Sequence, residues 1–163
     1  MNLFDFSKQA TVQDWHTQND QVMGGVSTSQ VQHSSEENAA RFSGKVSLEN
    51  DGGFAQIIFD KDIPNLSDYD GVELNVKGDG KTYQLRLENN PEIAAYSQSF
   101  AVKDDWHSVH LLFADFAASH NGEPAPDAPG LDLSNLETVG ILIGDKQEGE
   151  FEMFIKEMSV YKA

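Results

Sequence analysis

Residues 40–48 read Ala40-Arg41-Phe42-Ser43-Gly44-Lys45-Val46-Ser47-Leu48 and alternate along their whole length. Beginning at Ala40, every second position is apolar or glycine, and the positions between them are charged or hydroxylated. Successive side chains of a β-strand point to opposite faces, so a period of two predicts a strand with one buried face.

The rest of the chain repeats this kind of segment between turn residues. The expected strands are residues 3–6, 26–32, 54–59, 71–77, 82–88, 98–102, 107–113, 138–143 and 151–161. Asn50 to Gly53 predicts a hairpin joining 40–48 to 54–59, and Gly78-Asp79-Gly80 predicts a tight hairpin turn before 82–88. Thr11 to Asp20 is expected to be a loop around Trp15, either without regular structure or with a single turn of helix. No segment has a sustained helical period, so we expect an all-β, antiparallel β-sandwich or barrel.

The alternation also predicts the core and the register. The expected core residues are Phe42, Val46, Leu48, Val72, Leu74, Val76, Leu85, Leu87 and Ile141. The side chains expected to be exposed or on a concave face are Arg41, Lys45, Glu73, Lys77, Arg86 and Glu88. In 151–161 the apolar parity changes midway, which predicts a β-bulge near Lys156-Glu157. The first and last segments are both strand-like, so we expect the termini to pair.

Composition limits the classes of function. The 163 residues suit one domain, expected over 1–163, and carry 27 acidic against 11 basic residues, a formal net charge of −16. Such a charge repels nucleic acid and anionic membrane surfaces. There is no cysteine, so a disulfide or thiolate metal site is excluded. We see no signal peptide or membrane span and expect a cytoplasmic protein without membrane insertion. Residues 114–132 form a long irregular, proline-rich stretch, and 117–129 are expected to be the most mobile part.

Two segments share the order polar residues, glycine pair, apolar residue. They are Asn19 to Ser27 and Asn50 to Phe54. Adjacent glycines suit positive φ or a close approach of another backbone. The two pairs are therefore either two separate turns or parts of one surface formed where the segments meet. The residues of that candidate surface are Trp15, Asn19, Asp20, Met23, Gly24, Gly25, Ser27, Asn50, Gly52, Gly53 and Phe54.

The two arginines, Arg41 and Arg86, are also candidate binding residues. If their strands share a sheet, they concentrate scarce positive charge on one polar face. The alternative is a solvated face with ordinary pairing to Glu73 and Glu88. Trp15 and Trp106 are each either a platform for stacking a sugar or part of the core or its rim.

An ordered set of motifs extends from Trp15 to the last strand. It comprises Trp15, Asn19-Asp20, Val22-Met23-Gly24-Gly25-Val26-Ser27, Phe42-Ser43-Gly44, Asn50-Asp51-Gly52-Gly53-Phe54, Tyr69-Asp70-Gly71, Lys77-Gly78-Asp79-Gly80, Tyr83, Trp106 and Phe113-Ala114-Asp115-Phe116. The chain thereby resembles the complex I intermediate-associated protein 30 family. The resemblance implies a galactose-binding-like jelly roll. It also implies a chaperone-like role, because the best-known members are mitochondrial factors that bind assembly intermediates of respiratory complex I. A chain with no transit peptide and little beyond the domain is expected of a stand-alone bacterial member.

Catalytic and metal-binding patterns are weak. His107 and His110 fall on opposite faces of their expected strand, and no nucleophile–base or acid–base pair can be placed together. Asp68, Asp70 and Asp79 are candidate calcium ligands, since galactose-binding-like sandwiches often hold that ion and calcium takes six or more oxygens. Their alternative role is in turns. We expect no cofactor and no enzymatic activity.

Two functions from different classes remain. The leading hypothesis is a non-enzymatic protein-binding module that resembles the assembly factors and binds an assembly intermediate. The alternative is a module for a carbohydrate or another small, sugar-like ligand, which this kind of fold commonly binds.

Overall fold

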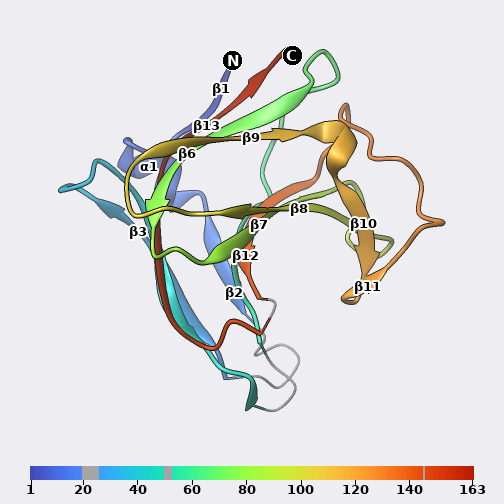
Figure 1. The fold of residues 1–163 in the computed structure, drawn as a ribbon. Coiled ribbons are helices and arrows are strands. Elements are labelled where there is room, and N and C mark those ends of the chain that lie inside the picture. The colour runs from blue at the N-terminus through green and yellow to red at the C-terminus, as the bar shows by residue number, and fades with distance from the viewer. Residues whose placement is uncertain (20–25, 50–52, 145) are drawn as a thin grey trace.

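The computed structural model describes residues 1–19, 26–49, 53–144 and 146–163. The described residues form two antiparallel sheets that face each other (Figure 1). The six-stranded sheet has the order β3-β4-β13-β6-β9, with β1 also paired to β13, and the seven-stranded sheet has the order β11-β10-β8-β7-β12-β5-β2. The expected all-β, antiparallel class is confirmed.

The six-stranded sheet contains β1 (Asn2–Asp5), β3 (Thr28–Ser34), β4 (Ala39–Val46), β6 (Gly71–Gly78), β9 (His107–Leu112) and β13 (Gly149–Tyr161). The seven-stranded sheet contains β2 (His16–Asn19), β5 (Ala55–Phe59), β7 (Thr82–Glu88), β8 (Ala95–Ala101), β10 (Ala117–His120), β11 (Glu123–Pro124) and β12 (Thr138–Ile143). The short helices are α1 (Gln9–Gln13) and the 3-10 turn η3 (Phe113–Asp115). No helix of the described residues is long and apolar enough to cross a membrane.

The core lies between the sheets and follows the predicted alternation. Phe42, Leu74, Leu85 and Ile141 are fully buried, as are most of the other expected core residues. Leu48 is the exception and the prediction for it is wrong, because its exposed fraction is 38%. β4 ends at Val46, so the chain has left the sheet before it reaches Leu48.

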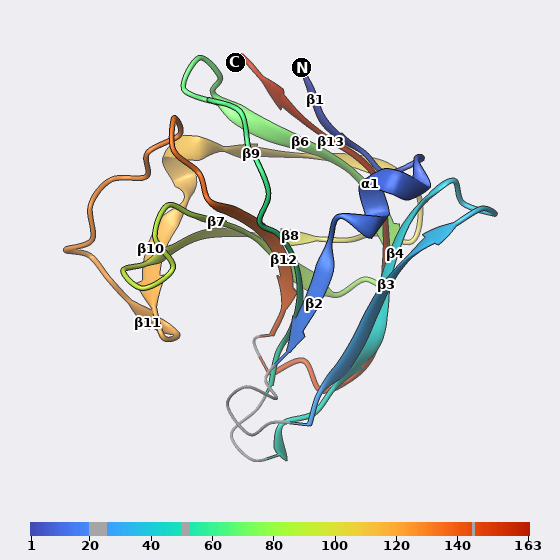
Figure 2. The same cartoon turned by 180° about the vertical axis from the view of Figure 1, so that it is seen from behind.

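The bulge and the pairing of the termini are confirmed. The register between β13 and β6 shifts between Ile155 and Glu157. The extra residue is Lys156, and it allows Ile155 and Met158 to point into the core although their sequence parity differs. β1 pairs with β13 near the end of the chain, and Figure 2 shows the two termini side by side.

Both predicted hairpins are wrong. β5 does not pair with β4 but lies in the other sheet, between β12 and β2, with every residue buried. β6 and β7 also lie in opposite sheets, so the turn at Gly80 (φ +82°) belongs to a crossover. The period of two identifies which face of a strand is buried but not which strand is its neighbour. The strands β2, β10 and β11 were not predicted, because they are short and weakly patterned.

Candidate functional site

The flanks of the two glycine-containing segments lie at one end of the sandwich. Asn19 is paired with Ala55, the residue that follows Phe54. Ser27 exchanges hydrogen bonds with the backbone of Ser47. We call this region, defined by Asn19, Ser27, Gly53, Phe54 and Gly144, the Gly-rich end. Asp20, Met23, Gly24, Gly25, Asn50 and Gly52 lie outside the described residues, so the predicted contact between the glycine pairs stays a prediction.

Polar side chains at the Gly-rich end hold the fold together. The Ser29 hydroxyl donates to Asn19 Oδ1 at 2.6 Å, which links β3 of one sheet to β2 of the other. The Ser47 amide donates to Ser27 Oγ at 2.9 Å, and Ser27 is fully buried. Each such bond contributes on the order of 1 kcal/mol to folding. These two side chains therefore have a structural role.

Gly144 belongs to the same end of the molecule. A side chain at Gly144 would come within 3.6 Å of the Gly53 carbonyl oxygen and of Phe54 Cβ. The side-chain amide of Gln147 donates hydrogen bonds to the carbonyl oxygens of Gly144 and Thr82 and accepts one from the Thr82 amide. These bonds connect the start of β7 to this region as well. The Gly-rich end thus gathers the ends of β2, β5, β7 and β12.

Trp15 lies in the core, with an exposed fraction of 4%. Its ring packs against Phe4, Phe6 and Phe59 at centroid distances of 5.1, 5.5 and 5.9 Å. It therefore fits the core alternative and not a sugar-stacking platform. Its indole N–H is buried without a hydrogen-bond partner in the described part of the chain.

The idea that Arg41 and Arg86 share a polar face is wrong. Arg41 is on β4 of the six-stranded sheet and Arg86 is on β7 of the seven-stranded sheet. The Arg41 guanidinium is paired with Glu152 at 2.6 and 2.7 Å. The crossover between β6 and β7 separates the two arginines, and sequence alternation alone cannot reveal such a crossover.

The three candidate calcium ligands do not come together. Asp68 and Asp70 precede β6 and Asp79 follows it, and a strand of eight residues spans about 26 Å. Asp79 accepts hydrogen bonds from the Tyr83 hydroxyl and from the amides of Lys81 and Glu152. Among the described residues there is no cluster of three or more acidic or histidine side chains suited to a metal ion.

Tyr83 is held in its neutral form by its surroundings. Burial raises the pKa of the fully enclosed Tyr83 phenol, and the nearby carboxylate of Asp79 raises it further. The hydroxyl donates to that carboxylate at 2.9 Å. The hydrogen bond anchors the start of β7, and the raised pKa keeps the Tyr83 phenol protonated near neutral pH.

The outer face of the seven-stranded sheet is mostly polar. Strand pairing places its side chains in two rows that cross β2, β5, β12, β7 and β8. One row is Gln18, Gln56, Leu142, Gln84 and Ser99, and the other is His16, Ile58, Gly140, Arg86 and Ser97. We call these two rows the polar face. They supply amide, hydroxyl, imidazole and guanidinium groups, but neither row contains a phenylalanine, tyrosine or tryptophan.

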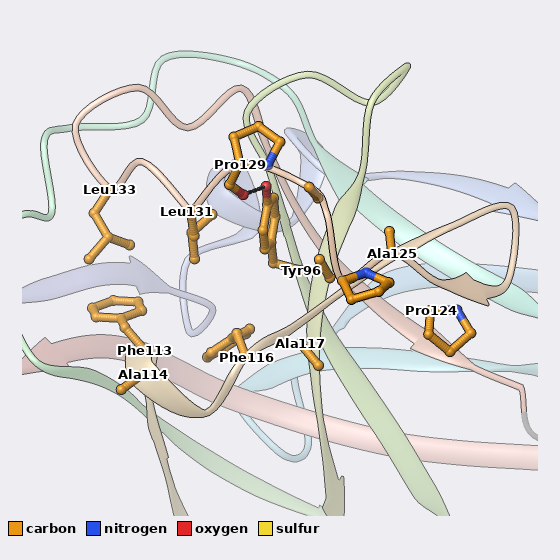
Figure 3. Close-up of a pocket in the computed structure, with 14 residues that line it drawn as sticks. Tyr96, Phe113, Ala114, Phe116, Ala117, Pro124, Ala125, Pro129, Leu131 and Leu133 are labelled. Carbon is orange, nitrogen blue, oxygen red and sulfur yellow. Dashed lines mark hydrogen bonds between the residues drawn. The ribbon is translucent and has the colours of Figure 1, made fainter.

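A pocket of about 670 Å³ opens where residues 113–133 fold over β8 (Figure 3). Its lining residues are Tyr96, Phe113, Ala114, Phe116, Ala117, Ala118, Pro124, Ala125, Pro126, Ala128, Pro129, Gly130, Leu131 and Leu133. We call it the apolar pocket. The Tyr96 hydroxyl, which is the only polar side-chain group in this lining, donates to the Pro129 carbonyl oxygen.

Local sequence explains why this segment leaves space. β10 and β11 form a narrow hairpin whose turn uses Asn121 (φ +50°) and Gly122 (φ +80°). The prolines that follow cannot donate a backbone hydrogen bond to a neighbouring strand, so the chain leaves the sheet and then returns to it. We call residues 113–133 the arch. Leu131 and Leu133 pack against the core and fix the far side of the arch. The segment was predicted to be irregular, which is wrong for β10 and β11.

A second hollow of about 380 Å³ adjoins the apolar pocket. Tyr96, Pro129 and Gly130 line both, so the Tyr96–Pro129 hydrogen bond stands between them. Ile93, half of which is exposed, lines the second hollow. Asn89 supports its floor by bonding the backbone of Asp132 and Asn135. The sequence indicated neither hollow; its only signal was the long proline-rich stretch.

Comparison with protein families gives one decisive match. The sequence profile of the family described as complex I intermediate-associated protein 30 matches residues 4–155. The chain belongs to this family. The resemblance drawn from the motifs is thereby confirmed over nearly the whole length. Comparison with curated proteins finds no match.

Solved structures similar to this family member include carbohydrate-binding modules and an agarase. The family 11 module of the cellulase Lic26A-Cel5E of Clostridium thermocellum superposes with a TM-score of 0.75 at 15% identity, covering 100% of this chain and 94% of the module. The same family's module in complex with a β-1,3-1,4-mixed-linked tetrasaccharide gives 0.70 at 14%, covering 92% and 89%. The agarase AgWH50C gives 0.70 at 9%, covering 100% of this chain and 26% of the enzyme. These likenesses confirm the galactose-binding-like jelly roll.

Proposed function

We propose that the protein is a non-enzymatic, cytoplasmic protein-binding module that acts like the assembly factors of its family. The observation that carries this proposal is the apolar pocket. Its walls are aromatic, aliphatic and proline side chains, and its one hydroxyl is already engaged with Pro129. Such a pocket suits an apolar side chain of another protein.

The same lining disfavours a sugar. A sugar ring carries several hydroxyls, and an unpaired hydroxyl in an apolar site costs about 1–3 kcal/mol. The apolar pocket offers no amide, carboxylate or cationic side chain to pair with them. Family membership points in the same direction, toward binding of an assembly intermediate of a respiratory complex.

Affinity purification with chemical crosslinking from the native cell tests this proposal. We expect a defined protein partner to co-purify with the wild-type protein and to be lost with Phe116→Asp, which places a charge in the pocket wall. Ala101→Asp, which places the same charge at the exposed far end of β8, is the matched control and is expected to keep the partner. Recovery of no specific protein from any variant would contradict the proposed function.

A carbohydrate or other small polar ligand is the second candidate, and the polar face supports it. The amides of Gln18 and Gln56 are neighbours on this face, and beyond Leu142 the amide of Gln84 and the guanidinium of Arg86 lie together on β7. A module of this fold is known with a bound tetrasaccharide. Calorimetry with mixed-linked glucan oligosaccharides tests it: binding that Arg86→Ala abolishes would favour this candidate, and no heat with any oligosaccharide would exclude those ligands.

A further inference from the structure

The charge around the apolar pocket has a single sign. Between Lys103 and Lys146 the chain contains no lysine or arginine. The charged residues within the arch are Asp115, Glu123, Asp127 and Asp132, and all four are exposed. Each is a direct chain neighbour of one or two lining residues, so the segment that forms the apolar pocket carries four exposed carboxylates, which we call the acidic border.

These carboxylates are poorly neutralised by the arch itself. Asp132 accepts hydrogen bonds from the amide and hydroxyl of Ser134, which lower its pKa and keep it ionised. No described ion pair involves Asp115, Glu123 or Asp127. The only other ionisable side chains among residues 113–133 and the lining residues of the apolar pocket are His120 and Tyr96. The border therefore attracts positive charge at neutral pH.

The adjoining hollow extends this surface. It brings exposed Ile93 to one side of Tyr96, while Phe116 and Leu131 lie on the other side. Its charged lining residues, Asp132 and Glu137, are again acidic. The apolar pocket and this more polar hollow, which Asn89, Asn90 and Asn135 also line, share one wall and the same sign of charge. This fits a chain in which cationic side chains flank an apolar one.

We propose that the apolar pocket and its neighbour bind a basic polypeptide segment whose large apolar side chain enters the pocket. This rests on the proposed protein-binding function and names the chemistry of the partner. The lysines or arginines of that segment face Asp115, Glu123, Asp127 and Asp132, and its apolar side chain packs against Phe116 and Leu131. Anionic lipid is disfavoured as the occupant, because the border has the same sign of charge.

Fluorescence anisotropy with short synthetic peptides tests the inference. The first peptide carries a central Leu-Phe pair with lysines on both sides; in the second, alanines replace the pair; in the third, glutamates replace the lysines. The protein variants are Ala118→Phe, which fills the pocket, and Ala101→Phe, the same change at the exposed far end of β8. Circular dichroism and thermal melting establish that both variants are folded.

We expect the first peptide to bind wild type and Ala101→Phe equally and Ala118→Phe at least about tenfold more weakly. The alanine and glutamate peptides should both bind wild type about tenfold more weakly than the first. Added salt should weaken binding of the first peptide. The protein should still bind it more tightly than the alanine peptide, because salt screens the lysines that both peptides share and not the Leu-Phe pair.

Equal binding of the first and alanine peptides, equal binding to both variants, or no binding would overturn the inference. The purification from native cells separates this failure from that of the function. If Ala118→Phe still captures the wild-type partner, the protein-binding function stands and the pocket inference falls. If no variant captures a partner, the proposed function itself falls.

Discussion

The Gly-rich end and the apolar pocket lie at opposite ends of β8, which pairs Ala101 with Thr82 at one end and Tyr96 with Leu87 at the other. At the Gly-rich end the polar side chains of Asn19 and Ser27 are committed to hydrogen bonds inside the protein. At the pocket, apolar side chains remain open. The difference teaches that conspicuous sequence motifs can serve the fold, while a proline-rich connection forms the open apolar surface for which we propose partner binding.

The largest expected effect comes from a glycine at which two backbones touch. A Cβ at Gly44 would lie 2.0 Å from the Thr28 carbonyl oxygen and 2.7 Å from Ser29 Cα. Gly44→Val must therefore push β3 away from β4, and we expect a loss of about 3 kcal/mol or more in unfolding free energy by urea denaturation. Gly130→Val beside the pocket meets open space and should lose less than about 0.5 kcal/mol. Equal losses of unfolding free energy for the two variants would contradict the contrast between a close backbone contact at Gly44 and open space at Gly130.

Ser27→Ala tests the structural role assigned to the Gly-rich end. The substitution leaves the Ser47 amide without the Ser27 hydroxyl as its acceptor, and we expect a loss of about 2 kcal/mol in unfolding free energy. Ser99→Ala, at an exposed site on the polar face, is the control and should change stability by less than about 0.5 kcal/mol. If Ser27→Ala leaves the unfolding free energy unchanged, the Ser27 hydroxyl does not stabilise the fold.

The stability of the protein at alkaline pH is expected to depend on Tyr83, which lies near the start of β7 beside the Gly-rich end. Its folded-state pKa is raised above the unfolded value, so its contribution is present below about pH 10 and is lost as pH rises further. We expect the wild-type unfolding free energy to fall by up to about 1.4 kcal/mol more per pH unit above pH 10 than that of Tyr83→Phe. Parallel pH profiles for the two proteins would show that Tyr83 is not the group responsible.

The smallest effect is expected at the pocket. Tyr96→Phe removes the hydrogen bond to Pro129 that divides the two hollows, and we expect a loss of about 1 kcal/mol. Because that bond tethers the arch, amide hydrogen exchange should accelerate at Ala125 and Ala128 while β12 keeps its protection. Unchanged exchange in the arch would mean that the prolines alone hold it.

Much of the fold was predictable because alternation reports burial directly. Phe42, Val72 and Leu85 followed from the period of two, and the change of parity in 151–161 located the bulge at Lys156. Strand neighbours were not predictable in this way. Every residue of β5 is buried, so its sequence does not alternate and gives no sign that β5 lies in the opposite sheet from β4.

The candidate site was harder to predict for the same reason. Asn19 and Ser27 stand out in the sequence, yet their side chains are used internally. The pocket depends on Tyr96, Phe116 and Leu131, which come from three separate segments and share no spacing. Only the proline-rich composition of residues 114–132 gave a signal, and that signal was not a motif.

Site-specific photocrosslinking in the native cell tests the central claim most directly. A photoreactive phenylalanine analogue replaces Ala125 in the apolar pocket or Ser99 on the polar face, and crosslinked products are identified by mass spectrometry. The account predicts that Ala125 yields a specific protein adduct and that Ser99 yields none. A protein adduct from Ser99 with none from Ala125 would contradict it.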